Sequence, residues 1–216
     1  MNKKIKSFWQ TFRQSIGLTL VMMVMCGLLF PLTLTGLASL IFPHQASGST
    51  VEVDGKVIGV ENVGQEFTQN YFLWGRPSAY HYNVYKEDES GKPVYLNGEA
   101  FIGLSSGSAN YAPSNPNLTN RVSLDMAKFL ELNPSVEAKD IPSDLLTASG
   151  SGLDPHISLQ AAMIQVPRIE KASGISANQI EQIISHHTEK QLFGLLGEET
   201  VNVLLVNKEI ASTMNQ

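Results

Sequence analysis

The chain has 216 residues, a formal net charge of −5 and one cysteine. All 20 acidic residues follow Thr50, so the later part of the chain carries a formal charge of about −9, which argues against nucleic acid or an anionic lipid surface as its partner. Because Cys26 lies in an apolar run, we expect neither disulfides nor thiol chemistry in the rest of the chain.

The N-terminal region predicts a transmembrane helix over residues 15–43. The run from Ile16 to Phe42 has 27 residues and no charged side chain. As a helix it would rise roughly 40 Å, enough to cross a hydrocarbon core of about 30 Å with some tilt. Pro31 lies near its middle, and a kink at that position is tolerated inside a membrane.

Charge predicts the orientation of this helix. Four basic residues fall within residues 1–14, and no Lys or Arg follows the span until Lys56. The positive-inside rule therefore places 1–14 in the cytoplasm and 44–216 outside, in a single-pass protein of the cell membrane. The alternative is a cleaved signal peptide, whose apolar region is usually about 7–15 residues, shorter than this run.

The first half of the outer region contains a predicted hairpin, a predicted helix and a long loop. "TVEVDGKVIGVE" alternates apolar and polar residues around Asp54-Gly55, which is typical of a β-hairpin. "GQEFTQNYFLWG" has aromatic residues at helical spacing and ends before Pro77. "LSSGSANYAPSNPNLTNR" is rich in Gly, Ser, Asn and Pro, and a loop of that length is usually functional or contacts a partner.

The second half contains mainly helical patterns. We expect a helix near 121–133, a short strand in "IPSDLLTA", and a helix in "SLQAAMIQVPRIEKA" that Pro167 kinks or restarts. "SANQIEQIISHHTEKQLFGLLG" predicts a further helix, with Ser176 and Gln179 spaced as a capping box. "VNVLLVN" predicts a buried strand. The fold class expected is thus a single N-terminal transmembrane helix plus one mixed α/β extracytoplasmic domain over 44–216.

The stretch "ASGSGLDPHIS", residues 148–158, has two interpretations. Ser149, Asp154 and His156 offer the groups of a hydrolytic triad, although triad members converge in space rather than in sequence. The second interpretation is structural and treats the stretch as a strand-to-helix corner. Its two glycines permit a sharp turn, Asp154 caps a helix, and Pro155 takes the first helical position.

No other group of residues in the sequence predicts a binding or catalytic site. No phosphate-binding G-x-x-x-x-G-K-[ST] motif occurs, and no filter-like sequence for potassium. His186 and His187 are adjacent, so on a helix they would point about 100° apart and could not easily share an ion. No pattern matches a zinc or calcium site. The residues alone therefore predict no catalytic, cofactor or metal site.

A set of motifs resembles the C subunit of the Kdp-type potassium-transporting ATPase, the KdpC family. In chain order they are "YFLWGRPSA", "SGSANYAPSNP", "DLLTASGSGLDPHIS", "AAMIQVPRI", "HTE" and "LLGEETVNVLLVN". The resemblance covers nearly the whole chain, including the N-terminal span. The least similar parts are "KEDESGKPVYLNG" and the tail "KEIASTMNQ".

The resemblance implies a non-catalytic subunit that assists assembly of an ATP-driven potassium importer and shapes potassium access to its pore. The implied partners are a channel-like A subunit, a P-type ATPase B subunit and a small F peptide. These partners, rather than this chain, would handle ATP, Mg and K⁺. Competing functions are an anchored extracytoplasmic hydrolase and a solute-binding lipoprotein-like receptor; Cys26, in mid-span, disfavours the receptor.

Under this resemblance the glycine-serine stretch and the 105–117 loop are expected to face the pore subunit. Arg76 is alternatively expected to form an ion pair with an inner carboxylate such as Asp154. The candidate contact or structural residues are Arg76, Pro77, Ser114, Asn115, Pro116, Ser149, Gly150, Gly152, Asp154 and His156.

Overall fold

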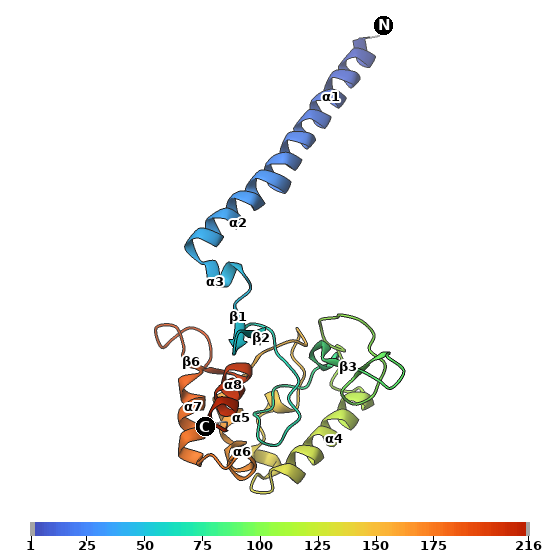
Figure 1. Cartoon of the computed structure of the whole chain (residues 1–216). Coiled ribbons are helices and arrows are strands. Elements are labelled where there is room, and N and C mark those ends of the chain that lie inside the picture. The colour runs from blue at the N-terminus through green and yellow to red at the C-terminus, as the bar shows by residue number, and fades with distance from the viewer. Residues whose placement is uncertain (1–2, 215–216) are drawn as a thin grey trace. The chain divides into compact units, whose positions relative to one another are not determined.

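The computed structural model of the chain describes residues 3–214 and divides into two units, Met1–Thr50 and Val51–Gln216 (Figure 1). The first unit is helical. It comprises α1 (Lys3–Val24), a π-helical turn (Met25–Leu29), α2 (Phe30–Ile41) and the short α3 (Pro43–Ala46). Within it, Ser7–Ile41 is the one described helical stretch that is long and apolar enough to cross a membrane. The predicted single helix is therefore present.

The π-helical turn lies directly before Pro31. A proline has no N–H, so it cannot donate to the carbonyl group four residues earlier. The turn changes the pairing at this point, because Phe30 donates its N–H to the carbonyl oxygen of Met25, five residues back. Thr33 Oγ1 also donates to the carbonyl oxygen of Leu29 at 2.7 Å. The helix thus continues from α1 into α2, whose first turn contains Pro31 (Figure 1).

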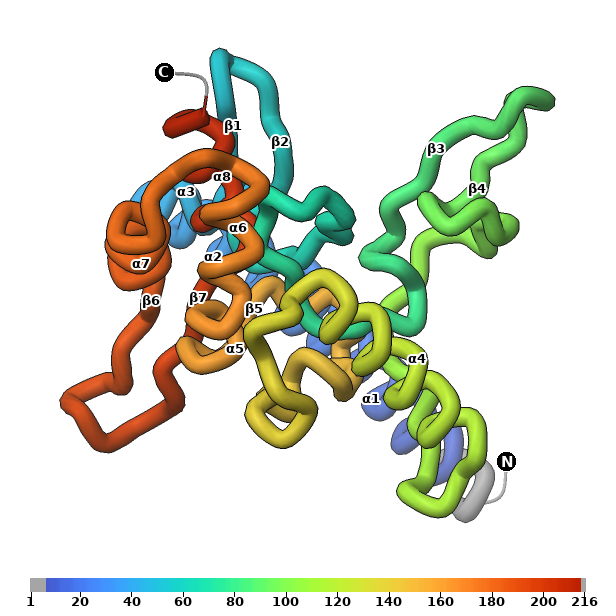
Figure 2. The backbone as a smooth tube through the Cα atoms, turned by 90° about the horizontal axis from the view of Figure 1, so that it is seen from below, coloured from blue at the N-terminus to red at the C-terminus, as the bar shows by residue number. Residues whose placement is uncertain are grey.

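The second unit contains three small sheets (Figure 2). The hairpin of β1 (Thr50–Val53) and β2 (Lys56–Val60) is as predicted, with positive φ at Asp54 and Gly55, which a two-residue turn requires. A second antiparallel pair joins β3 (Tyr85–Glu87) to β4 (Pro93–Tyr95). The third sheet has the order β5-β7-β6 and is antiparallel; its strands are His156–Ser158, Thr200–Asn202 and Thr188–Glu189, respectively.

Helices pack around the third sheet and form the main core. They are α4 (Pro116–Leu132), α5 (Leu159–Met163), α6 (Val166–Ser173), α7 (Ala177–His186) and α8 (Val203–Met214), with 3₁₀ turns at His81–Asn83, Ala138–Asp140 and Ser143–Leu145. The side chains at the centre are almost fully buried: Ile157, Ile169, Ile180, Ile184, Val201, Val206 and Ile210. Two predictions are confirmed, since Ser176 and Gln179 form the capping box of α7 and a second helical piece, α6, begins at Val166 with Pro167 in its first turn.

Four predictions for the outer region are wrong. "IPSDLLTA" contains a 3₁₀ turn instead of a strand, and "VNVLLVN" is a strand only to Asn202, after which α8 begins. The helix predicted after Ser176 ends at His186 instead of continuing to Gly197. "GQEFTQNYFLWG" is irregular instead of helical.

Buried amide side chains explain the last error. Asn207 on α8 accepts the N–H of Leu73 at 2.7 Å and donates to its carbonyl oxygen at 2.9 Å. Gln165 pairs in the same way with the N–H and carbonyl group of Trp74, at 2.9 and 3.2 Å. These two residues, which we call the amide clamps, satisfy backbone groups that a helix would otherwise pair internally, so the segment does not need to be helical.

Arg168 supports the same segment from α6. Its guanidinium group donates to the carbonyl oxygens of Asn70 and Phe72, at 2.6 and 3.0 Å, and lies 4.5 Å from the centre of the Trp74 ring. Burial lowers the pKa of Arg168 to about 10. Carbonyl dipoles and an aromatic face therefore stabilise this buried cation.

Candidate functional site

The glycine-serine stretch forms a tight turn stabilised by its own side chains. Ser149 accepts the N–H of Ser151 on its hydroxyl, and Ser151 does the same for Leu153, at 3.3 and 3.1 Å. Gly152 has a φ of +66°, a conformation that favours glycine. Gly150 has no such φ and has open space where a Cβ would lie. Only one of the two glycines is therefore required by the backbone.

The 105–117 segment, whose last two residues begin α4, lies against this turn. Gly107 donates its N–H to the carbonyl oxygen of Ser151 at 2.7 Å. A Cβ at Gly152 would collide with the carbonyl oxygen of Gly107. The structure thus brings together the two segments that the resemblance implies as a contact surface, with Gly150 and Ser114 both exposed.

Arg76 links the segment 74–78 to the same turn through an ion pair and a hydrogen bond. Its Nη1 lies 3.1 Å from Oδ2 of Asp154, so the expected ion pair is present. Arg76 Nε also donates to the carbonyl oxygen of Thr147 at 3.3 Å, and Ser78 Oγ donates to that of Gly152 at 2.6 Å. The side chains of both members of the ion pair are about a quarter exposed. Arg76 also positions backbone, through its hydrogen bond to Thr147.

Tyr82 contacts Arg76, one member of this ion pair. Its hydroxyl group donates to the carbonyl oxygen of Arg76 at 2.7 Å. Burial, followed by the charge of Asp154, raises the pKa of Tyr82 well above its ordinary value. The ring also fills the space beside Gly64, where a Cβ would collide with it. Tyr82 is therefore a packing residue that stays neutral.

Asp154 does not cap a helix, which corrects the structural interpretation of the stretch. Its Oδ1 accepts the N–H of His156 at 3.0 Å, and the chain then enters β5 instead of a helix. Ser158 caps α5 two residues after His156. The cap followed by proline occurs instead at Asn115-Pro116, where the Asn115 side chain accepts the N–H of Asn117 at 2.9 Å and α4 begins.

The residues of the triad hypothesis do not form a hydrolytic site. His156 Nδ1 lies 3.9 Å from Asp154 Oδ1, but the other carboxylate oxygen pairs with Arg76. Ser149 interacts with Ser151, and within residues 3–214 no hydrogen bond connects it to His156. A serine nucleophile needs a general base, here His156, within hydrogen-bonding distance. The hydrolase alternative is therefore unsupported.

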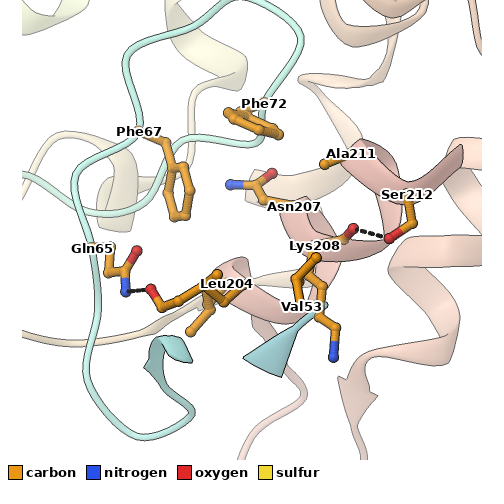
Figure 3. A pocket seen from close by; sticks show the side chains of 10 residues that line it. Val53, Gln65, Phe67, Phe72, Leu204, Asn207, Lys208, Ala211 and Ser212 are labelled. Atoms are coloured by element: carbon orange, nitrogen blue, oxygen red, sulfur yellow. Dashed lines mark hydrogen bonds between the residues drawn. The ribbon is translucent and has the colours of Figure 1, made fainter. Parts of the chain in front are cut away.

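An apolar hollow of about 270 Å³ lies between the β1–β2 hairpin and α8 (Figure 3). Four polar side chains line it. Gln65, Asn207 and Ser212 are engaged with the backbone of Ile58, Leu73 and Lys208, respectively, and the side chain of Lys208 is the fourth.

Sequence reasoning missed an exposed apolar loop between β6 and β7, which Figure 2 shows extending beyond the sheet. Leu192, Phe193, Leu195 and Leu196 are 60–87% exposed. The loop is ordered by a hydrogen bond of 2.8 Å from the N–H of Leu192 to the carbonyl oxygen of Leu196. Large exposed apolar groups in one place are typical of a contact surface. The available signal was the run "LFGLLG", in which two glycines interrupt the helical pattern.

Comparison with known proteins decides the family. The family model described as "K+-transporting ATPase, c chain" (KdpC) matches residues 12–212. The chain belongs to the KdpC family. The potassium-transporting ATPase KdpC subunit of Clostridium kluyveri is 46% identical over 210 residues, 97% of each chain. That of Clostridioides difficile is 47% identical over 205 residues, covering 95% of this chain and 98% of the relative. The KdpC assignment thus rests on the whole chain instead of on one motif.

Proposed function

We propose that this chain is the accessory, non-catalytic subunit of an ATP-driven potassium import complex of the P-type class. The observation that carries the proposal is the family match over residues 12–212, which includes both the apolar helix and the outer domain. The absence of a serine–histidine hydrogen bond at the candidate triad, among the described residues, agrees with a role in assembly instead of hydrolysis.

The proposed orientation follows from charge. Lys3, Lys4, Lys6 and Arg13 all precede the uncharged run that begins at Ile16, so the N-terminus is cytoplasmic and the outer domain lies outside the cell membrane. A reporter fused after Gln216 that is active only outside the cytoplasm tests this. Activity of a cytoplasm-specific reporter at the same position would overturn the orientation.

The proposed partners are a channel-like A subunit, a P-type ATPase B subunit and a small F peptide, which together handle ATP, Mg and K⁺. The docking surface on this chain comprises the 105–117 segment and the turn at 149–152 within the glycine-serine stretch. The hydrogen bond between Gly107 and Ser151 supports a single surface. Gly152 permits the close approach of the two segments, and the Arg76–Asp154 pair holds the neighbouring segment against the turn. A rigid surface loses little conformational entropy on binding.

Co-purification tests the docking surface. Gly150→Trp and Ser114→Trp place bulk at exposed positions of the surface, and we expect each to reduce recovery of the A subunit with the tagged chain. Gln182→Trp, on the exposed side of α7, is the matched control and should leave recovery unchanged. Normal assembly and normal potassium uptake in both surface variants would remove this surface from the proposal.

A further inference from the structure

Three side chains converge where α7 ends against α8. Nε2 of His187 lies 2.7 Å from Oε2 of Glu209, and Nδ1 of His186 lies 3.5 Å from the same oxygen. The two imidazole rings stack with their centres 4.9 Å apart. The expectation that these adjacent histidines diverge is therefore wrong. The two rings converge because the backbone of His187 is not helical: its φ is −100° and its ψ is 21°.

The backbone holds this arrangement in place. The N–H of His187 donates to the carbonyl oxygen of Ile183 at 3.2 Å, and its own carbonyl oxygen accepts the N–H of Asn202 at 3.3 Å. Glu209 lies on α8 beside the fully buried Ile210. Two of the three side chains thus project from backbone fixed by the helix end, the sheet and the core.

The ligand atoms have the chemistry and spacing of a transition-metal site. One atom from each of the three residues lies within 4.8 Å of the others. In a tetrahedral zinc site, with bonds of about 2.0–2.1 Å, ligand atoms are separated by about 3.3 Å. His186 is 75% exposed, so its ring is free to rotate by the small amount needed. Imidazole nitrogen favours Zn²⁺, Cu²⁺ or Ni²⁺ over K⁺, Mg²⁺ or Ca²⁺, which prefer oxygen.

We propose that His186, His187 and Glu209 bind a divalent transition metal, with Zn²⁺ as the representative ion and water at the open position. The bound ion would connect the end of α7 to α8 across 22 residues of sequence. Because α8 also carries the Asn207 clamp, the ion would stabilise the outer domain as a whole. None of these three residues belongs to the proposed docking surface.

Zinc titration of the full-length chain, purified in detergent without a histidine tag, tests the proposal. We expect one Zn²⁺ per chain by equilibrium dialysis with metal analysis, and a rise in the thermal midpoint when Zn²⁺ is added. His186→Gln and Glu209→Gln should each weaken binding by at least about tenfold. His186 is the more informative variant, because its exposed side chain can be replaced without disturbing the core.

His81→Gln provides the matched control. It removes another histidine–carboxylate pair, in which Nδ1 of His81 lies 3.0 Å from Oε1 of Glu66. We expect this variant to bind Zn²⁺ as the unaltered chain does. Failure of the unaltered chain to take up Zn²⁺, or equal uptake by His186→Gln and Glu209→Gln, would overturn the proposal and leave the cluster as an ion pair.

Discussion

At the level of single residues, three buried polar side chains determine the path of one segment of this domain. Asn207, Gln165 and Arg168 are each at least 94% buried, and each bonds to backbone between residues 70 and 74. Sequence periodicity could not predict this, because an asparagine or glutamine within an apolar run gives no sign of which distant backbone it pairs with. The Arg76–Asp154 pair was predictable as a hypothesis, since Arg76 follows the aromatic segment and Asp154 follows the glycine turn.

Replacement of Asn207 tests the first clamp. Asn207→Leu keeps the volume but leaves the N–H and carbonyl group of Leu73 buried without partners. We expect the free energy of unfolding to fall by about 3 kcal/mol, measured by urea denaturation. Asn120→Leu, at an exposed position on α4, is the control and should change little. An equal effect of the two substitutions would contradict the clamp.

Tyr82 makes the domain sensitive to alkali. The fold raises the pKa of Tyr82 above its ordinary value of 10.0, because burial disfavours the phenolate. This contribution to stability is therefore complete below about pH 10 and is lost as the pH rises above it. Tyr82→Phe should remove that alkaline component while costing about 1 kcal/mol at neutral pH for the lost hydrogen bond. The free energy of unfolding of both proteins, measured from pH 8 to 11, checks both effects. An equally steep fall of this free energy above pH 10 in the two proteins would contradict the role of Tyr82.

At the level of elements, local signals succeeded where a turn or cap is specified by adjacent residues. The Asp54-Gly55 hairpin and the Ser176 capping box depend on residues within a few positions of one another. The predictions failed where contacts with residues distant in sequence override the local hydrophobic periodicity, as in the segment held by the amide clamps. The strand predicted in "VNVLLVN" failed for a related reason: helical geometry from Val203 onward places Val203, Val206 and Ile210 on the buried side of α8.

Paired glycine substitutions test the turn that supports the docking surface. Gly152→Ala combines a positive φ with a collision against Gly107, so it should lose at least about 1–2 kcal/mol of stability. Gly150→Ala meets open space at an ordinary φ and should change stability by less than about 0.5 kcal/mol. Thermal unfolding of the two variants measures the difference. Equal melting temperatures would show that the turn does not need its glycine.

At the level of the whole molecule, composition anticipated the division into an apolar helix and an α/β region. The long uncharged run predicted the first, and the structure places the boundary between units at Thr50 and Val51. The candidate site was predictable only as a set of segments. The exposed loop at 192–196 and the histidine cluster appear only once β6, β7 and α8 are assembled.

Reductant tests how the outer region is held together. The single cysteine, Cys26, lies in the apolar helix, so no disulfide can link parts of the domain. We expect 5–10-fold changes in dithiothreitol concentration to leave the urea midpoint of the domain at 51–216 unchanged, in contrast to domains that contain disulfides. A shift of the midpoint with reductant would imply an intermolecular link through Cys26.

The amide clamp between Leu73 and Asn207 spans 134 positions of the chain. During synthesis, the backbone of Leu73 cannot gain this partner until the ribosome has added Asn207, when residues 51–206 have already been made. Contacts this distant in sequence form slowly, because closing a long loop costs entropy before the contact stabilises anything. Gln165 and Arg168, which hold the neighbouring backbone, are added earlier, so the Asn207 clamp is the last of the three contacts that a nascent chain can form.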